Sequence, residues 1–284
     1  MKKLLFLFTF TLLLTACKQS TTTTQSALGA VTGSSCLIGK WSDSRLPLTI
    51  KLSSEFAGDI IPAHEVNGLN RFEQMAQVWN VAASPKTLLT VPFPVAATTG
   101  FADTASFRDG EIGIYKSHQW FTGISSGAIA ITQFYGVVTS TPGLGQYIDL
   151  THADIMVNYR DFGSSIVMAN AGYFTYDLPT ILLHELGHLV GLCHETVRPS
   201  VMDPHYIATQ RSLYQFDKDI IKNIYIDGVI TKNNNTNALS MPLGSEVKGT
   251  IELHADGKCI HYMNGKKTFE HVVDDFKKNK LSQK

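Results

Sequence analysis

Three histidines and one glutamate carry the clearest chemistry in this sequence. The segment HELGHLVGLCH places His184, Glu185, His188, Gly191 and His194 in the order H-E-x-x-H-x-x-G-x-x-H. Four residues of a helix make slightly more than one turn, so the first two imidazoles share a face, roughly 6 Å apart along the axis. That separation suits two ligands of one metal ion.

The glycine predicts how a third ligand is recruited. Because Gly191 can adopt a positive φ, it can end the helix and turn the chain back, which brings His194 to the same ion. Three neutral imidazoles leave one open position on a tetrahedral zinc, which is typical of catalytic rather than structural sites. The spacing therefore predicts a single catalytic zinc held by His184, His188 and His194.

The glutamate predicts the reaction. Glu185 lies about 100° around the helix from His184, where it can hydrogen-bond a water on the metal without becoming a fourth ligand. In this interpretation Glu185 is the general base toward a metal-activated water and later passes the proton to a leaving amine. A purely structural metal needs no base beside it, so the pattern favours a hydrolase.

The extended motif, with Met202 eight residues after His194, resembles the metzincin zinc proteases and their Met-turn. The short interval, and the Pro204-His205-Tyr206 segment that follows it, are most similar to the matrixins. The resemblance implies that Met202 forms an apolar floor beneath the metal. It also implies that Pro204 and Tyr206 belong to the wall of a substrate pocket.

The same resemblance implies an α+β, zincin-like fold with a twisted, mixed five-stranded sheet, three helices, an active-site helix and the Met-turn. Hydrophobic spacing agrees with strands at 47–52, 128–138 and 146–158 and with helices at 66–81 and 213–225.

A tight reversal is predicted between the two longest strands. Pro142, Gly143 and Gly145 lie between them, so the strands should be antiparallel neighbours. In the matrixin order, residues 127–135 form an edge strand above the cleft. Its unpaired backbone would align an extended peptide substrate by strand addition.

Structural metals are a point of departure from the family. Matrixins usually hold structural zinc and calcium through His and Asp residues in the loops before the catalytic helix. The nearest candidates here, His118, His152 and Asp154, do not match that ligand pattern. We therefore expect one catalytic zinc, no structural calcium and no second zinc.

The first 16 residues resemble a bacterial lipoprotein signal peptide. Two lysines precede an apolar run over residues 4–14, which is too short to cross a bilayer. Residues 14–17 resemble a lipobox, which implies that Cys17 is acylated and becomes the mature N-terminus. We expect an exported protein, lipid-anchored to a bacterial membrane. Lys18 replaces the Asp of an inner-membrane retention signal, which favours the outer membrane or cell surface.

Charge restricts the partners. The chain has 24 basic and 24 acidic residues, so it lacks the basic field that would neutralise phosphates, and we exclude nucleic acid. Removing residues 1–16 deletes two lysines and no acid, which leaves 22 basic against 24 acidic residues and a formal charge of −2. The expected partners are a protein or peptide substrate and the membrane, through the lipid, and we expect a monomer.

Three cysteines remain if Cys17 is lipidated. Cys36, Cys193 and Cys259 allow three single pairings, and an exported protein can form one of them. We favour Cys36 with Cys193. As an alternative, Cys36 lies before the first strand and could mask the metal, as the propeptide cysteine of some zymogens does.

The sequence divides into five parts: a signal peptide (1–16), a lipid-anchored flexible tether (17–43), a metzincin catalytic domain (44–228), a linker (229–245) and a C-terminal extension (246–284). We expect the extension to form short strands at 246–262 and an amphipathic helix at 268–278.

The predicted function is that of a zinc-dependent endopeptidase that hydrolyses extracytoplasmic proteins. The alternative is a non-catalytic surface lipoprotein that retains the metzincin fold and binds peptides through the edge strand. The intact Glu185 favours the enzyme.

Overall fold

The computed structural model describes residues 36–96, 101–168, 175–206, 209–229, 241–254 and 256–272. The predicted signal peptide, the lipobox cysteine and residues 18–35 of the predicted tether lie outside the described residues, as do residues 230–240 of the predicted linker. Among the described helices, none combines the length and the apolar composition that a bilayer crossing requires.

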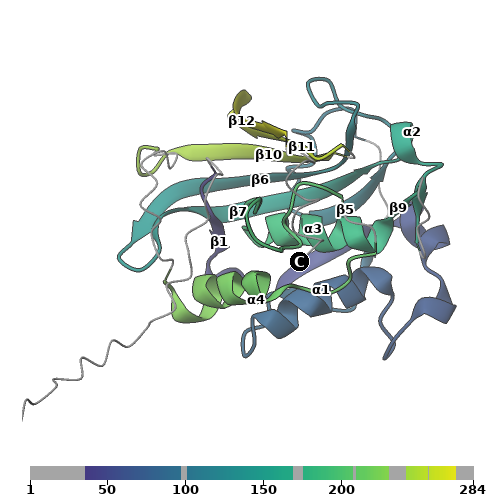
Figure 1. Cartoon of the computed structure of the whole chain (residues 1–284), viewed down its shortest axis with the longest axis horizontal. Coiled ribbons are helices and arrows are strands. Elements are labelled where there is room, and N and C mark those ends of the chain that lie inside the picture. The colour runs from purple at the N-terminus through teal and green to yellow at the C-terminus, as the bar shows by residue number, and fades with distance from the viewer. Residues whose placement is uncertain are drawn as a thin grey trace, which may run out of the picture.

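A mixed β-sheet forms the frame of the molecule (Figure 1). Its longest strands, β6 (Ala128–Thr141) and β7 (Gly145–Asn158), form an antiparallel hairpin. Next to β7 lies β5 (Ile112–Ser117), followed by β2 (Leu48–Ser53), and both pairings are parallel. The predicted antiparallel hairpin is confirmed.

Beyond β6 the sheet continues into the C-terminal part of the chain. β10 (Glu246–His254) pairs antiparallel with β6, and β11 (Lys258–Met263) and β12 (Lys266–Val272) follow it in antiparallel order. Figure 1 shows these three strands in yellow-green at one side of the sheet.

Short elements complete the structure. They are the strands β1 (Gly39–Trp41), β3 (Leu89–Thr90), β4 (Val95–Ala96), β8 (Ile166–Val167) and β9 (Tyr176–Asp177), and the 3₁₀ turns Asp43–Arg45, Ser54–Asp59 and Pro62–His64. β3 and β4 pair with β2, β1 pairs in parallel with β7, and β8 pairs with β9 in a separate small sheet.

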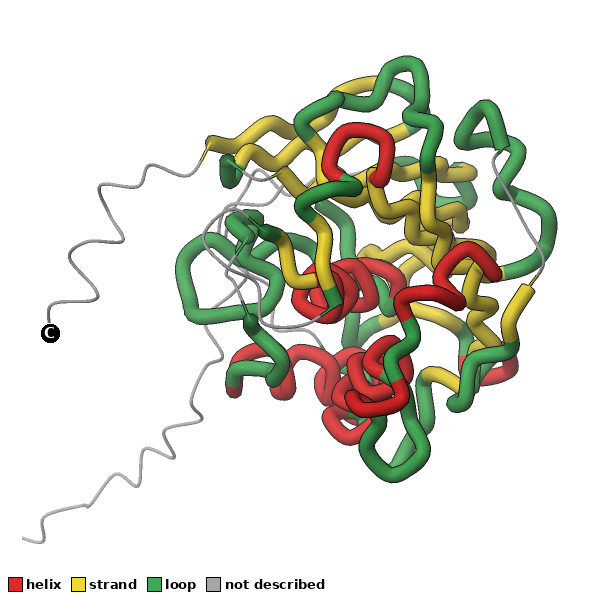
Figure 2. The backbone as a smooth tube through the Cα atoms, turned by 90° about the vertical axis from the view of Figure 1, so that its right-hand side faces the viewer, coloured by secondary structure: helices red, strands yellow, loops and turns green. Residues whose placement is uncertain are grey.

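Helices α1 (Arg71–Ala82) and α3 (Leu178–Leu189) pack against each other beside the sheet. α4 (Gln215–Lys222) continues into a π-helical turn (Asn223–Asp227), and α2 (Tyr159–Phe162) is a single turn. In Figure 2 most of the helical turns lie below the strands. The main hydrophobic core lies between the sheet and these helices.

Local sequence explains where α1 begins. The Asn70 side chain accepts hydrogen bonds from the backbone N–H groups of Phe72 and Glu73, and the Glu73 carboxylate accepts one from the Asn70 backbone N–H. This capping box satisfies donors that the first helical turn leaves unpaired. The helix therefore starts five residues later than the hydrophobic spacing predicted.

Three sequence predictions need correction. The predicted α+β fold with a mixed sheet is confirmed, but over the described residues that sheet has ten strands rather than five, because the C-terminal strands and several short strands join it. Residues 127–135 are not an edge, because β10 pairs with β6 along that stretch. The helix predicted at 268–278 is replaced over residues 268–272 by strand β12, and residues 273–278 lie outside the described residues.

The predicted boundary between tether and catalytic domain is also displaced. Residues 39–41, placed in the flexible tether, form β1, and both Gly39 and Trp41 are buried. The Trp41 indole N–H donates to the carbonyl of Leu189 at 2.8 Å, at the end of α3. The folded unit therefore begins before residue 44.

Candidate metal centre

Helix α3 carries the first two predicted ligands. Asp177 caps its N-terminus: one carboxylate oxygen accepts from the Thr180 backbone N–H at 3.1 Å and from the Thr180 hydroxyl at 2.7 Å. Pro179 lies in the first turn, where its missing N–H removes no helical hydrogen bond. Every residue of the helix is buried, so its ligands face the protein interior.

Gly191 makes the turn after the helix. Its φ is +98°, a value that side chains disfavour, and a Cβ there would lie 2.0 Å from the backbone oxygen of Gly39. Only glycine fits both conditions. The turn brings His194 back toward the helix, as the sequence predicted.

The three predicted ligands meet at one point. The Nε2 atoms of His184 and His188 lie 3.0 Å apart, and each lies 3.1 Å from Nε2 of His194. Three nitrogens this close can all lie about 2 Å from one zinc ion. Within the described ranges this is the one group of His, Cys, Asp or Glu side chains whose spacing could hold a metal.

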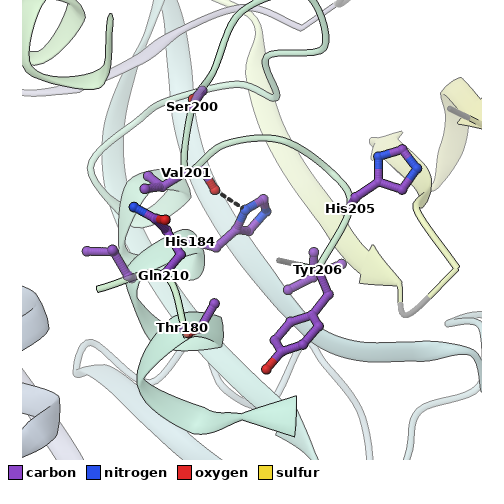
Figure 3. Close-up of a pocket in the computed structure, with 9 residues that line it drawn as sticks. Thr180, His184, Ser200, Val201, His205, Tyr206 and Gln210 are labelled. Atoms are coloured by element: carbon purple, nitrogen blue, oxygen red, sulfur yellow. Dashed lines mark hydrogen bonds between the residues drawn. The ribbon is translucent and has the colours of Figure 1, made fainter. Parts of the chain in front are cut away.

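Outer contacts orient the two helical imidazoles. His184 Nδ1 lies 2.7 Å from the carbonyl oxygen of Val201, and His188 Nδ1 lies 2.8 Å from that of Leu192. A carbonyl accepts only, so each Nδ1 carries the proton and each Nε2 presents its lone pair to the common point. Figure 3 shows the contact between His184 and Val201.

Burial favours the same protonation state. It lowers the pKa of His184 to about 4 and the pKa of His188 well below its ordinary value. Both imidazoles are therefore neutral at pH 7, which is the form that binds a metal. The donor set and its geometry fit zinc.

Glu185 points one oxygen at a partner and leaves the other without one. Thr132 of β6 donates its hydroxyl to Oε2 at 2.5 Å, while buried Oε1 has no hydrogen-bond partner among the described residues. Burial raises the pKa of Glu185 to about 8, and the Thr132 hydrogen bond partly opposes that shift. An unpaired buried carboxylate oxygen is costly unless a ligand completes it.

The Met202 side chain lies against the catalytic helix. A Cβ added at Gly187 would lie 2.3 Å from the Met202 sulfur, so glycine is needed for this close approach. Asp217, near the start of α4, accepts hydrogen bonds from the backbone N–H groups of Val201 at 3.0 Å and Tyr214 at 2.9 Å. The turn that holds Met202 is thereby tied to α4.

The matrixin family model matches residues 53–226, more than half of the chain. The chain belongs to the matrixin family. No curated protein matches it. Membership and the His cluster together support a zinc metalloprotease.

Beside the metal centre of this matrixin lies a narrow pocket (Figure 3). Its lining residues are Thr180, Leu183, His184, Ser200, Val201, His205, Tyr206, Gln210 and Leu253. Tyr206 lines this pocket, and its hydroxyl accepts a hydrogen bond from the Asp177 backbone N–H at 2.5 Å. Pro204 is buried but is not among the lining residues, whereas His205 is.

A disulfide joins the start of the described chain to the residue next to the third ligand. It joins Cys36 to Cys193, the residue before His194, and connects segments 157 positions apart. The Cys36 sulfur is committed to that bond, so in this structure it is not a metal ligand. The structure therefore shows the predicted Cys36–Cys193 disulfide and not a Cys36 thiol that masks the metal.

The three candidates considered for structural metals do not form a metal-binding cluster among the described residues. His152 is buried and contacts Asp154 at 2.7 Å and the carbonyl of Phe107 at 2.9 Å, while His118 is exposed with its ring 5.9 Å from that of Tyr159. Desolvation by burial disfavours the charged imidazole of His152, but the hydrogen bond and charge of the Asp154 carboxylate outweigh it, so the pKa of His152 is raised.

Two residues that contact the site were missed by sequence reasoning. One is Thr132 on β6, and the other is His261 on β11, whose Nε2 lies 2.9 Å from Nδ1 of His194. Each is more than 50 positions from the residue it contacts. No local motif marks them, since only the strand pairing brings them to the site.

Proposed function

We propose that this matrixin is a zinc endopeptidase in which Glu185 is the general base. The convergence of three imidazoles at one point supports this proposal, because the set provides three ligands and leaves a position open for chemistry. The neighbouring carboxylate, with its unpartnered Oε1, is the group that would act there.

His184, His188 and His194 would hold the ion. When bound, zinc supplies Lewis-acid polarisation of the scissile carbonyl and lowers the pKa of water. Glu185 accepts a proton through Oε1 and later donates it to the leaving amine. Thr132 donates its hydroxyl to Oε2 and so holds the carboxylate in place.

We also propose that the enzyme acts outside the cytoplasm on protein substrates, anchored through lipid on Cys17. The signal-like residues 1–16 support this. The Cys36–Cys193 disulfide fits an oxidising compartment. The alternative role as a peptide-binding lipoprotein would also need β10 to leave β6, and the intact Glu185 favours the enzyme.

Mass spectrometry of products tests the proposal. The zinc-loaded protein is incubated with an unfolded protein, and the new termini are identified. Internal cuts that a chelator abolishes and added zinc restores are expected of an endopeptidase. Cuts confined to chain ends would contradict the endopeptidase assignment. Stoichiometric zinc without cleavage, both in this protein and in the variant Gly249→Leu, which should free the β6 edge, would contradict the enzymatic function.

A further inference from the structure

The strand expected to receive a substrate already has a partner within the chain. β10 pairs antiparallel with β6 from Glu246 opposite Val137 to His254 opposite Ala128. An extended peptide that adds to a sheet edge makes this kind of pairing. The protein's own C-terminal segment therefore occupies the substrate position. We call residues 241–272 the covering segment.

One row of side chains across three strands contacts the metal centre at both of its ends. Thr132 on β6 lies opposite Ile251 on β10, and Ile251 lies opposite His261 on β11, so the three share one face of the sheet. Thr132 contacts Glu185 at one end of the row, and His261 contacts His194 at the other. Ile251, 3% exposed, lies between the two contacts.

The next inward-facing residue of β10 reaches the pocket. Leu253, 2% exposed, lines the pocket beside His184 and Tyr206. Immediately after it, His254 forms a parallel bridge with His205 of the pocket wall. β10 thus lies between β6 on one side and the wall segment on the other. Figure 3 shows the yellow-green C-terminal strand passing beside His205.

The turn that follows β10 is shaped to this position. A Cβ at Gly257 would lie 2.0 Å from the His205 ring, so the turn can approach the wall only as glycine. Ile251 and Leu253 belong to the main core together with the residues of α3. The covering segment is therefore docked as part of the core.

The consequence is a closed site. The three histidines and Glu185 are each at most 4% exposed. An extended peptide cannot pair with β6 while β10 holds its hydrogen-bonding groups, and Leu253 forms part of the wall of the pocket beside the metal centre.

We propose that the covering segment is an intramolecular inhibitor that binds as a substrate would, with Ile251 in register between Thr132 and His261 and with Leu253 in the wall of the adjacent pocket. The inference rests on the proposed peptidase function. Activity toward peptides then requires β10 to leave β6. The occupant is this chain itself, so inhibition is independent of protein concentration.

Gly249 offers a way to release the segment. It lies opposite Phe134, and a Cβ there would come within 2.0 Å of the Phe134 ring. The substitution Gly249→Leu should push β10 away from β6. Gly58→Leu is the matched control, because its Cβ would meet nothing within 4 Å and its backbone has no positive φ.

An engineered disulfide between β6 and β10, here called the staple, should instead hold the two strands together. Val137 and Glu246 lie directly opposite each other at the accessible start of the β6–β10 pairing. The double variant V137C/E246C should form a cross-strand disulfide that keeps β10 in place. The single variants V137C and E246C are its controls, and all are assayed without reductant.

We expect Gly249→Leu to raise cleavage of an unfolded protein by roughly tenfold or more over both the parent and Gly58→Leu. The substitution should increase the fraction of molecules in which β10 has left β6, and only those molecules can bind a peptide. Adding Glu185→Gln to Gly249→Leu should abolish that gain. The staple should reduce residual activity below that of the single-cysteine controls. Circular dichroism checks that each variant is folded.

Zinc removal by a chelator gives a readout that does not depend on activity. The staple should slow it relative to the single-cysteine controls, and release should accelerate it. Equal activity in the parent, stapled and released proteins would overturn the inhibition while leaving the peptidase function intact. Equal zinc-removal rates in stapled and control proteins would also overturn it, even if Gly249→Leu fails to fold. Zinc-loaded proteins that never cleave would overturn the peptidase function and the inhibition with it.

Discussion

The catalytic segment (residues 178–206) and the covering segment (residues 241–272) meet at the same site but are specified differently. In the catalytic segment, the ligands lie within eleven consecutive residues, and helix geometry plus one glycine turn brings them together. In the covering segment, His261 reaches its partner His194 across 67 positions. A local motif therefore identifies the ligands, whereas access to them depends on long-range strand pairing.

The largest expected effect tests the catalytic segment alone. Glu185→Gln should lower peptide hydrolysis by roughly three orders of magnitude or more, because the amide cannot accept the proton. Zinc content should stay at that of the parent, since the three histidines are unchanged. Rates are best compared in the Gly249→Leu background, with metal measured by atomic absorption. Full activity would refute the assignment of Glu185.

Gly191→Ala tests whether the glycine turn is as necessary as the motif implies. A Cβ would meet the Gly39 backbone oxygen at 2.0 Å, at a φ of +98°. We expect a loss of about 3–5 kcal/mol in the free energy of unfolding. Urea denaturation measures it, with Gly58→Ala as the control. A loss below about 1 kcal/mol, within the range of ordinary substitutions, would show that the turn tolerates a side chain.

The disulfide holds the start of the folded chain to the residue beside the third ligand. The double variant Cys36→Ser with Cys193→Ser should lose about 2–4 kcal/mol of unfolding free energy, because the unfolded chain regains the freedom of a long loop. Denaturation under non-reducing conditions measures the loss. Stability equal to that of the parent would mean that the bond adds nothing to the folded unit.

His261→Ala tests the contact between the covering segment and the third metal ligand. Nδ1 of His194 loses the orienting contact with His261, so zinc affinity should fall by about tenfold. His261→Gln should recover part of it, because its amide oxygen can accept the same hydrogen bond. Competition with a chromogenic chelator gives both affinities. Parent affinity in His261→Ala would show that the covering segment does not orient the metal ligand.

Much of the fold followed from periodic patterns. The β6–β7 hairpin was predicted because two apolar runs flank a cluster of proline and glycine, and α1 because its apolar residues recur at helical spacing. Residues 266–272 were placed next to a predicted helix and partly within it, yet they form β12. Their strand conformation is stabilised by pairing with β11, which local spacing cannot reveal.

The sequence by itself determined the ligand set, because a helix and one positive-φ glycine fix the relative positions of His184, His188 and His194 whatever surrounds them. The tertiary structure alone decided that β6 is not an edge, that Ile251 lies in register between Thr132 and His261, and that Leu253 lines the pocket beside the metal centre. The physical reason is that strand pairing joins backbone groups that any sequence carries. Which strand takes an edge therefore depends on the packing of the whole chain.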